Sequence, residues 1–262
     1  MSRIAPAFSQ LKREEKQGLI PFIVAGDPDL QTTEALLVEL SDAGASVIEL
    51  GVPFSDPMAD GPVIQRASER ALRHGIGLGQ IFETLARARR RVTVPIVLFS
   101  YYNPLLQYGL EQLADDAKEA GVDGVLVTDL TPEESTGLTS ALRDRDLDLI
   151  FLVAPTSTDE RLKLIAEKAS GFIYAVSRAG VTGVQSNVSA DAERLVGRVR
   201  QFSSLPVAVG FGISDAAQVA QTWSYADAAV VGSAIVAEIE NCAGMPDTVQ
   251  RVGAFTRNLL PS

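Results

Sequence analysis

Short apolar runs alternate with longer amphipathic stretches along the whole chain. Each run is rich in β-branched residues and bounded by Gly, Pro or polar residues, which predicts a β-strand. The runs lack strict alternation of apolar and polar positions, as expected for parallel strands that are covered on both faces. Eight such runs occur, at 19–25, 47–50, 94–99, 124–127, 147–153, 172–176, 206–209 and 227–231.

The stretches between the runs carry helix signals. Segments 131–134 and 157–160 each combine Thr or Ser with acidic residues in the order of a capping box, and Gly44, Gly75 and Gly121 follow helical patterns as C-terminal stops. Strands that alternate with helices imply βαβ units and a parallel sheet, and eight of them imply closure. The predicted fold class is therefore α/β, a single (β/α)8 TIM barrel.

An open, doubly wound sheet is the alternative architecture. Such a sheet normally carries a glycine-rich GxGxxG turn after its first strand. The corresponding turn here reads Gly26-Asp27-Pro28-Asp29, without that motif. The barrel is therefore the preferred interpretation.

The length and the N-terminus bear on domain organisation. The chain has 262 residues, which one α/β barrel typically uses as a single domain spanning 1–262. The first residues, 1–17, are amphipathic and strongly charged, unlike a signal peptide, and we expect an extra N-terminal helix there.

Two connections are longer than the rest, 52–62 after the second predicted strand and 177–190 after the sixth. Both leave C-terminal ends of strands, where barrel enzymes place their active sites. Long loops at this position are expected to act as lids or docking surfaces, and tolerated insertions are the alternative.

Charge and cysteine content narrow the function classes. The net charge of −10 disfavours binding to nucleic acid or to anionic membranes, which require a basic face. The one arginine cluster, 87–91, ends a helical pattern and complements the helix dipole. The longest apolar run, 228–237, falls short of the roughly 20 residues of a membrane helix. Because Cys242 is the only cysteine, a reducing compartment, the cytoplasm, is expected.

Glu49 interrupts the apolar run 47–51. A carboxylate prefers water, so its place on a buried strand requires either an ion pair or a functional role. It stands near the C-terminal end of the strand, where barrels place catalytic groups. An apolar site favours the neutral acid, which suits a group that both gives and takes protons. We therefore predict that Glu49 is catalytic.

Asp60 lies in the long connection that follows, directly before Gly61 and Pro62. Its alternative roles are a helix N-cap or an Asp-Gly turn. As a second carboxylate from the same strand end, it is consistent with an acid–base pair. Asp56 is interpreted as a turn or partner-facing residue.

Other common catalytic groups are missing from the predicted strand ends. The only histidine, His74, ends a helical pattern, so a histidine-based metal site or triad is not expected and no metal is predicted. A Schiff-base mechanism lacks an obvious nucleophile because the lysines are assigned to helical stretches. These lysines are Lys12, Lys16, Lys118, Lys163 and Lys168.

Glycines cluster after the last two predicted strands, at 210–212 and at 232, where Gly232-Ser233-Ala234 leads into a helical pattern. Backbone N–H groups at a helix start bind phosphate, and barrels commonly bind it at this place. Ordinary tight turns are the alternative. A phosphate site of this kind needs no basic patch.

Four motifs, in this order, closely resemble the tryptophan synthase alpha chain family. They are Gly-Asp-Pro at 26–28, Glu-Leu-Gly-Val-Pro-Phe-Ser-Asp-Pro through Asp-Gly-Pro at 49–62, Ser-Arg-Ala-Gly-Val-Thr-Gly at 177–183, and Gly-Phe-Gly-Ile at 210–213. The resemblance covers nearly the whole chain. It implies retro-aldol cleavage of indole-3-glycerol phosphate to indole and glyceraldehyde 3-phosphate, without a cofactor in this chain. It also implies an α2β2 complex with a beta chain that uses pyridoxal phosphate to make tryptophan.

The resemblance also implies roles for individual residues. Glu49 resembles the general acid–base that protonates the indole ring carbon and removes the proton of the neighbouring glycerol hydroxyl. Asp60 resembles the carboxylate that binds the indole N–H and stabilises the protonated ring, and Phe99 stands where many relatives carry leucine. The remaining matched positions are Phe22, Leu126, Tyr174 and Phe211 around the indole, Gly183, Gly212, Gly232 and Ser233 in the phosphate cradle, and Thr182 in the loop whose closure orders the site.

Two other functions stay open at this point. One is another phosphate-binding barrel enzyme of the tryptophan pathway, which would use different acid–base residues. The other is a weakly active subunit whose main role is to activate the beta chain. Product identification with and without a beta chain separates them.

Overall fold

Eight parallel strands close into a barrel. The computed structural model describes residues 2–176, 185–210 and 212–261. Each strand pairs with the next along the chain, and β1 pairs with β8 to close the sheet. The strands are β1 (Gly18–Val24), β2 (Ile48–Gly51), β3 (Ile96–Ser100), β4 (Gly124–Val127), β5 (Asp148–Val153), β6 (Ile173–Val176), β7 (Val207–Gly210) and β8 (Ala228–Val231).

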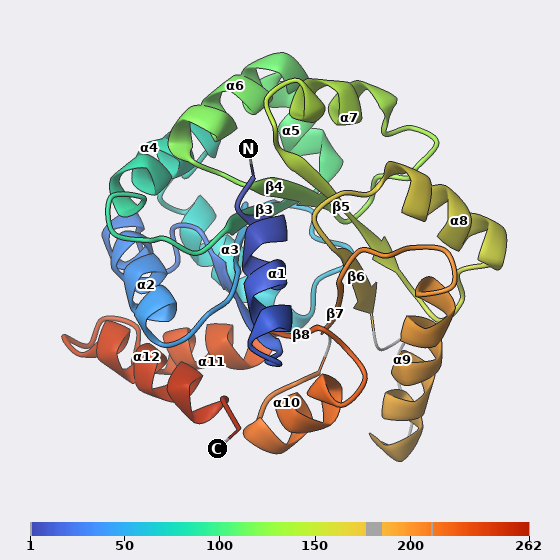
Figure 1. Ribbon diagram of the computed structural model, residues 1–262. Coiled ribbons are helices and arrows are strands. Elements are labelled where there is room, and N and C mark those ends of the chain that lie inside the picture. Colours follow the sequence, from blue (N-terminus) through green and yellow to red (C-terminus); the bar gives the residue numbers. More distant parts are fainter. Residues whose placement is uncertain (1, 177–184, 211, 262) are drawn as a thin grey trace.

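Helices form a ring around the barrel, while α1 lies across the middle of the view over one end of the strands (Figure 1). In the described ranges, no helix has both the length and the apolar character needed to cross a bilayer. The helices are α1 (Ile4–Arg13), α2 (Leu30–Asp42), α3 (Pro62–Leu72), α4 (Leu78–Ala88), α5 (Tyr102–Tyr108), α6 (Leu110–Ala120), α7 (Thr136–Arg143), α8 (Asp159–Lys168), α9 (Gln185–Val199), α10 (Ala216–Trp223), α11 (Ser233–Cys242) and α12 (Thr248–Asn258).

The strand predictions are confirmed, since each predicted run overlaps one observed strand and its ends differ by no more than two residues. The glycine stops are confirmed as well. Gly44, Gly75 and Gly121 have φ values of 100°, 66° and 83°, a left-handed conformation that favours glycine.

Two predicted helix starts are corrected. Segment 131–134 forms a turn, and α7 begins only at Thr136. The Pro132 carbonyl accepts hydrogen bonds from the side chains of Ser135 and Lys168, which holds the turn in place of a first helical turn. In segment 157–160 the N-cap of α8 is Thr158, whose side chain accepts from the Arg161 N–H.

The two long connections both end earlier than predicted, the first by one residue. The first runs from Val52 to Gly61 and enters α3 with Pro62 in its first turn. The second ends sooner than predicted, because α9 already begins at Gln185, and residues 177–184 lie outside the described residues. Both connections leave the C-terminal ends of their strands.

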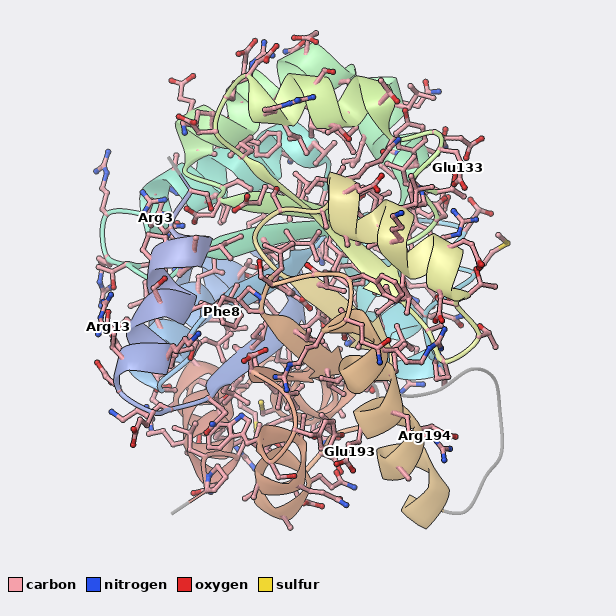
Figure 2. All side chains as sticks on the ribbon, turned by 45° about the vertical axis from the view of Figure 1, so that its right-hand side comes forward. Arg3, Phe8, Arg13, Glu133, Glu193 and Arg194 are labelled. Atoms are coloured by element: carbon pink, nitrogen blue, oxygen red, sulfur yellow. The ribbon has the colours of Figure 1, made fainter. Side chains whose placement is uncertain are left out.

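The opposite end of the barrel is closed by α1, which confirms the expected extra helix. Ile4 and Phe8 are buried and join the cluster that fills the barrel interior. Phe8 lies on the side of α1 that faces the strands (Figure 2), with its ring centroid 5.7 Å from that of Phe172. Burying one such side chain stabilises the fold by about 2 kcal/mol. Lys16 lies between α1 and β1, so its assignment to a helix was wrong.

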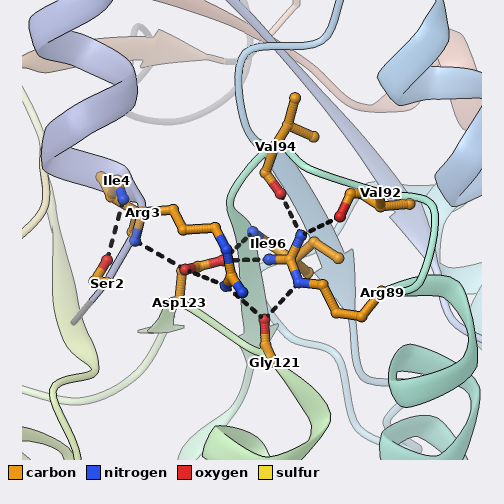
Figure 3. Close-up of polar contacts among 9 residues, drawn as sticks. All are labelled: Ser2, Arg3, Ile4, Arg89, Val92, Val94, Ile96, Gly121 and Asp123. Carbon is orange, nitrogen blue, oxygen red and sulfur yellow. Dashed lines mark hydrogen bonds and ion pairs between the residues drawn. The ribbon is translucent and has the colours of Figure 1, made fainter.

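A buried carboxylate fastens α1 to the barrel (Figure 3). Asp123, which is 1% exposed, accepts hydrogen bonds from the backbone N–H and the guanidinium of Arg3, each at 2.9 Å. It also accepts from the Arg89 guanidinium and, at 2.9 Å, from the Ile96 N–H at the start of β3. One side chain therefore joins α1, the end of α4, β3 and β4.

Candidate active site

A cavity of about 390 Å³ opens at the C-terminal ends of the strands. Its volume lies in the range of small-molecule sites, which is about 300–1,000 Å³. The wall is mostly apolar, with two carboxyl groups and the glycine-rich start of α11. The lining residues are Phe22, Glu49, Ala59, Asp60, Gly61, Ile64, Phe99, Tyr174, Gly212, Ile213, Ser214, Val230, Gly232, Ser233 and Ala234.

Glu49 contributes a buried carboxyl group to this cavity. It lies in β2 in register with Phe22 of β1 and Val97 of β3, and it is 1% exposed. Its Oε1 atom has no hydrogen-bond partner among the described residues. Because burial penalises the charged form, the pKa of Glu49 is raised from 4.5 to about 8. The group is therefore mostly a neutral acid at pH 7, and its conjugate base is strong enough to take a proton back.

An aromatic pair forms one side of the cavity. The rings of Phe22 and Phe99 meet edge to face, with centroids 5.2 Å apart and an interplanar angle of 74°. A Cβ atom at Gly51 would lie 2.6 Å from Cζ of Phe22, so glycine is needed there to seat the ring. An aromatic wall of this kind suits a flat apolar ligand.

Tyr174 approaches Glu49 from β6. Burial, and next the charge of Glu49, raise the pKa of Tyr174 well above 10, so its hydroxyl stays protonated. A Cβ atom on Gly210 would lie 2.0 Å from this hydroxyl oxygen. The tyrosine therefore occupies space that only a glycine at the end of β7 leaves open.

Asp60 reaches the cavity from the connection after β2. The N-cap of α3 is Gly61, so an N-cap role for Asp60 is excluded. Its backbone is held on both sides, by a bond from its N–H to the Pro57 carbonyl at 3.1 Å and a bond from Gln65 Nε2 to its own carbonyl at 2.8 Å. Burial raises the pKa of Asp60 to about 6, and a hydrogen bond from Tyr101 opposes the increase. At pH 7 the side chain is therefore mostly ionised.

The start of α11 provides a site for an anion. Gly232 is the N-cap, and Ser233 and Ala234 form the first turn at the cavity wall. The first N–H groups of a helix have no partner within the helix, and the dipole there favours negative charge. Gly212, with φ 80°, brings the loop after β7 to the same wall. A phosphate at this end would leave the apolar part of a ligand to the rest of the wall, which includes Phe22, Phe99 and Tyr174.

The structure brings most of the predicted site residues together. Leu126 is fully buried in the barrel interior, in register with Phe99, and does not itself line the cavity. Thr182, Gly183 and Phe211 lie outside the described residues. The predicted residues that line the cavity are Phe22, Glu49, Asp60, Tyr174, Gly212, Gly232 and Ser233.

Sequence reasoning missed several lining residues, among them Ile64, Ile213 and Val230. Val230 sits in an apolar strand where nothing distinguishes its inward position. Ile64 could have been found from its place in the first turn of the helix that follows Asp60. No group of three or more metal-ligating side chains forms among the residues described.

The fold and the cavity define a class, the (β/α)8-barrel enzymes with an active site at the C-terminal ends of the strands. Within that class the sequence matches one family. A family model described as tryptophan synthase alpha chain matches residues 8–260. The chain therefore belongs to the tryptophan synthase alpha chain family.

Individual relatives agree over nearly the full length. The chain is 51% identical to the tryptophan synthase alpha chain of Geotalea daltonii, covering 93% of this chain and 92% of that protein. It is 52% identical to that of Geobacter sulfurreducens, covering 90% and 89%. The crystal structure of tryptophan synthase subunit alpha from Legionella pneumophila superposes with a TM-score of 0.91 at 38% identity, covering 99% of this chain and 97% of that chain.

Proposed function

We propose that Glu49 and Asp60 carry out the reaction of the family in this chain, the cleavage of indole-3-glycerol phosphate to indole and glyceraldehyde 3-phosphate. The observation that carries the proposal is the buried Glu49 carboxyl group, whose pKa of about 8 allows both proton donation and proton removal near neutral pH. The activity, an indole-forming lyase step in tryptophan biosynthesis, follows from family membership.

The Glu49 carboxyl group carries out both proton transfers and ends the reaction with its proton restored. Neutral Glu49 gives its proton to the indole ring carbon that bears the glycerol side chain, and the ring becomes an electron sink. The Glu49 carboxylate then takes the proton of the hydroxyl on the attached side-chain carbon, that carbon becomes an aldehyde, and the carbon–carbon bond breaks. The bonding electrons return to the ring and release indole, while Glu49 regains its proton.

Asp60 stabilises this reaction without moving the ring proton. Its ionised carboxylate accepts a hydrogen bond from the indole N–H and balances the positive charge on the protonated ring. The pKa of about 6 leaves Asp60 charged at a pH where Glu49 is still neutral. Two carboxyl groups with separated pKa values can thus take different roles.

We propose that the indole and the phosphate of the substrate bind to different residues of the cavity wall. Phe22 and Tyr174 contact the indole, and Leu126 packs behind them in the barrel interior. Phe211, outside the described residues, keeps the indole-binding role that the family resemblance implies. Gly212, Gly232 and Ser233 bind the phosphate through backbone N–H groups and the helix dipole. Gly183 and Thr182, outside the described residues, keep the phosphate-binding and site-ordering roles that the family resemblance implies.

The proposed partner is a tryptophan synthase beta chain in an α2β2 complex, with pyridoxal phosphate in the beta chain. The connection after β2 offers a docking surface at the cavity rim, where the Met58 side chain is 92% exposed and Asp56 is exposed beside it. We also propose that the chain acts as one domain spanning 1–262 in the cytoplasm.

The test is indole formation by Glu49→Gln. The amide keeps the shape of the side chain but can neither give nor take the proton, so kcat should fall at least about 100-fold. Glu69→Gln, at an exposed position of α3, is the matched control and should keep activity. Product identification by chromatography, with and without a beta chain, measures the reaction. Substantial turnover by Glu49→Gln would refute the assigned role.

A further inference from the structure

Tyr101 links the third strand to the connection that carries Asp60. It follows β3 directly and is 5% exposed. The Ala59 N–H donates a hydrogen bond of 2.8 Å to the Tyr101 hydroxyl oxygen, across 42 residues of sequence. The residue that immediately precedes Asp60 is therefore held by a side chain from the neighbouring strand.

The backbone around Tyr101 is held by two hydrogen bonds. The Ser100 hydroxyl donates to the Tyr101 carbonyl at 2.9 Å, and the N–H of Tyr102 donates to Asp129 Oδ1 at 2.7 Å. The ring of Phe54 packs against that of Tyr101, with centroids 5.1 Å apart. The tyrosine thus contacts the connection after β2 near both of its ends.

The hydrogen-bond direction at Tyr101 follows from its two partners. Since the oxygen accepts from Ala59, the hydroxyl proton is free to be donated, and the carboxyl group of the next residue, Asp60, lies close enough for its charge to affect the pKa of Tyr101. Burial raises the pKa of Tyr101 to about 12, so the hydroxyl remains a donor throughout the working pH range. A hydroxyl group that accepts one hydrogen bond becomes a stronger donor in the next.

We propose that Tyr101 is a positioning residue for Asp60: its hydroxyl accepts from the Ala59 amide, donates to the Asp60 carboxylate and so fixes that carboxylate at the cavity. The ring-stabilising role of Asp60 rests on the proposed function, whereas the link between Tyr101 and the ionisation of Asp60 does not. A donor to the charged form lowers the pKa of a carboxyl group and opposes the effect of burial. Loss of this donor should therefore leave Asp60 protonated at higher pH.

The test compares Tyr101→Phe with Tyr108→Phe. The first variant keeps the ring against Phe54 and removes only the hydroxyl. The second removes a hydroxyl that donates to Asp116 on α6, at 2.5 Å, away from the cavity. The Asp60 carboxyl is followed by ¹³C NMR titration of aspartate-labelled protein. Its signal is assigned as the one missing from Asp60→Asn.

In Tyr101→Phe the titration midpoint of Asp60 should rise by about one pH unit, and the acid limb of kcat/KM should move with it. Well below the midpoint this corresponds to a loss of about tenfold in kcat/KM. Tyr108→Phe should change neither value. A second variant, with 3-fluorotyrosine at position 101, keeps the ring and has a more acidic hydroxyl, so the Asp60 midpoint should move downward.

An unchanged Asp60 midpoint in folded Tyr101→Phe, or in the fluorotyrosine protein if the phenylalanine variant does not fold, would overturn the inference. A uniform loss of activity at every pH with no shift in the titration would overturn it as well. If the midpoint shifts as expected while the wild-type protein forms no indole, the link between Tyr101 and Asp60 stands and the proposed function fails.

Discussion

Replacement of Glu49 by glutamine should make the protein more stable, by an amount that grows with pH. The native side chain is 1% exposed, and its Oε1 atom has no partner among the described residues. Burial raises its pKa from 4.5 to about 8. In the unfolded chain the same group loses its proton near the lower value, so the native state binds the additional proton between these pKa values. The contribution of Glu49 to the free energy of unfolding is therefore fully present below pH 4.5, the pKa of the unfolded chain. It is lost as pH rises through the native pKa of about 8.

The magnitude follows from the displacement of the pKa. Each unit is worth about 1.4 kcal/mol, so the shift corresponds to about 5 kcal/mol of lost stability at and above pH 8, as an upper bound. Glutamine has nearly the same shape and carries no charge at any of these pH values. The free energy of unfolding of Glu49→Gln should accordingly exceed that of the wild type by several kcal/mol at pH 8, and by much less at about pH 5.

Urea unfolding between about pH 5 and pH 8 measures this difference. Asp27 and Asp60, whose pKa values are also raised by burial, are present in both proteins, so their contributions cancel. Glu119→Gln, at an exposed position of α6, removes one charge without removing a buried group and serves as the control. A wild-type-to-variant difference that stays constant with pH would refute the reasoning, because a constant difference shows that Glu49 keeps its ordinary pKa.

Three further outcomes are expected. The pH profile of kcat/KM should be bell-shaped, rising near pH 6 as Asp60 ionises and falling near pH 8 as Glu49 loses its proton; a flat profile across that range would contradict the assignment. Gly210→Ala should lower kcat/KM by about tenfold or more, because its methyl group would lie 2.0 Å from the Tyr174 hydroxyl, and adding Tyr174→Phe should restore part of the activity. Asp123→Asn should cost about 3 kcal/mol in urea unfolding, since it leaves a buried arginine without its charge partner; a cost below about 1 kcal/mol would show that the ion pair contributes little.

The barrel could be predicted because its strands leave a clear trace in the sequence. Strands covered on both faces are continuous apolar runs, and the glycines at 44, 75 and 121 end helices through their own backbone conformation. Glu49 stood out because a charge breaks one of these runs. These signals are local, so they need no knowledge of the partners in space.

Features that depend on distant partners could not be predicted in the same way. The turn at 131–134 replaces a helical turn partly because Lys168, far along the chain, donates to the Pro132 carbonyl. Asp123 has the sequence of a turn residue before a strand, yet it binds a guanidinium 120 residues away. Tyr101, in a run of two tyrosines, gives no sign that its hydroxyl meets the backbone of Ala59. In each case the deciding contact joins elements that only the closed sheet brings together.

Because α1 closes one end of the barrel, ligands can enter and leave the cavity only from the other end. With Phe8 against Phe172, and Asp123 fastening the helix, the described part of the chain leaves the cavity open toward the C-terminal strand ends alone. The substrate and both products must then pass through the same opening, one after another. Indole carries no charge that would hold it in the barrel, so the molecule that covers this opening determines where the released indole goes. A partner seated over the connection after β2 would be the first molecule that each departing indole meets.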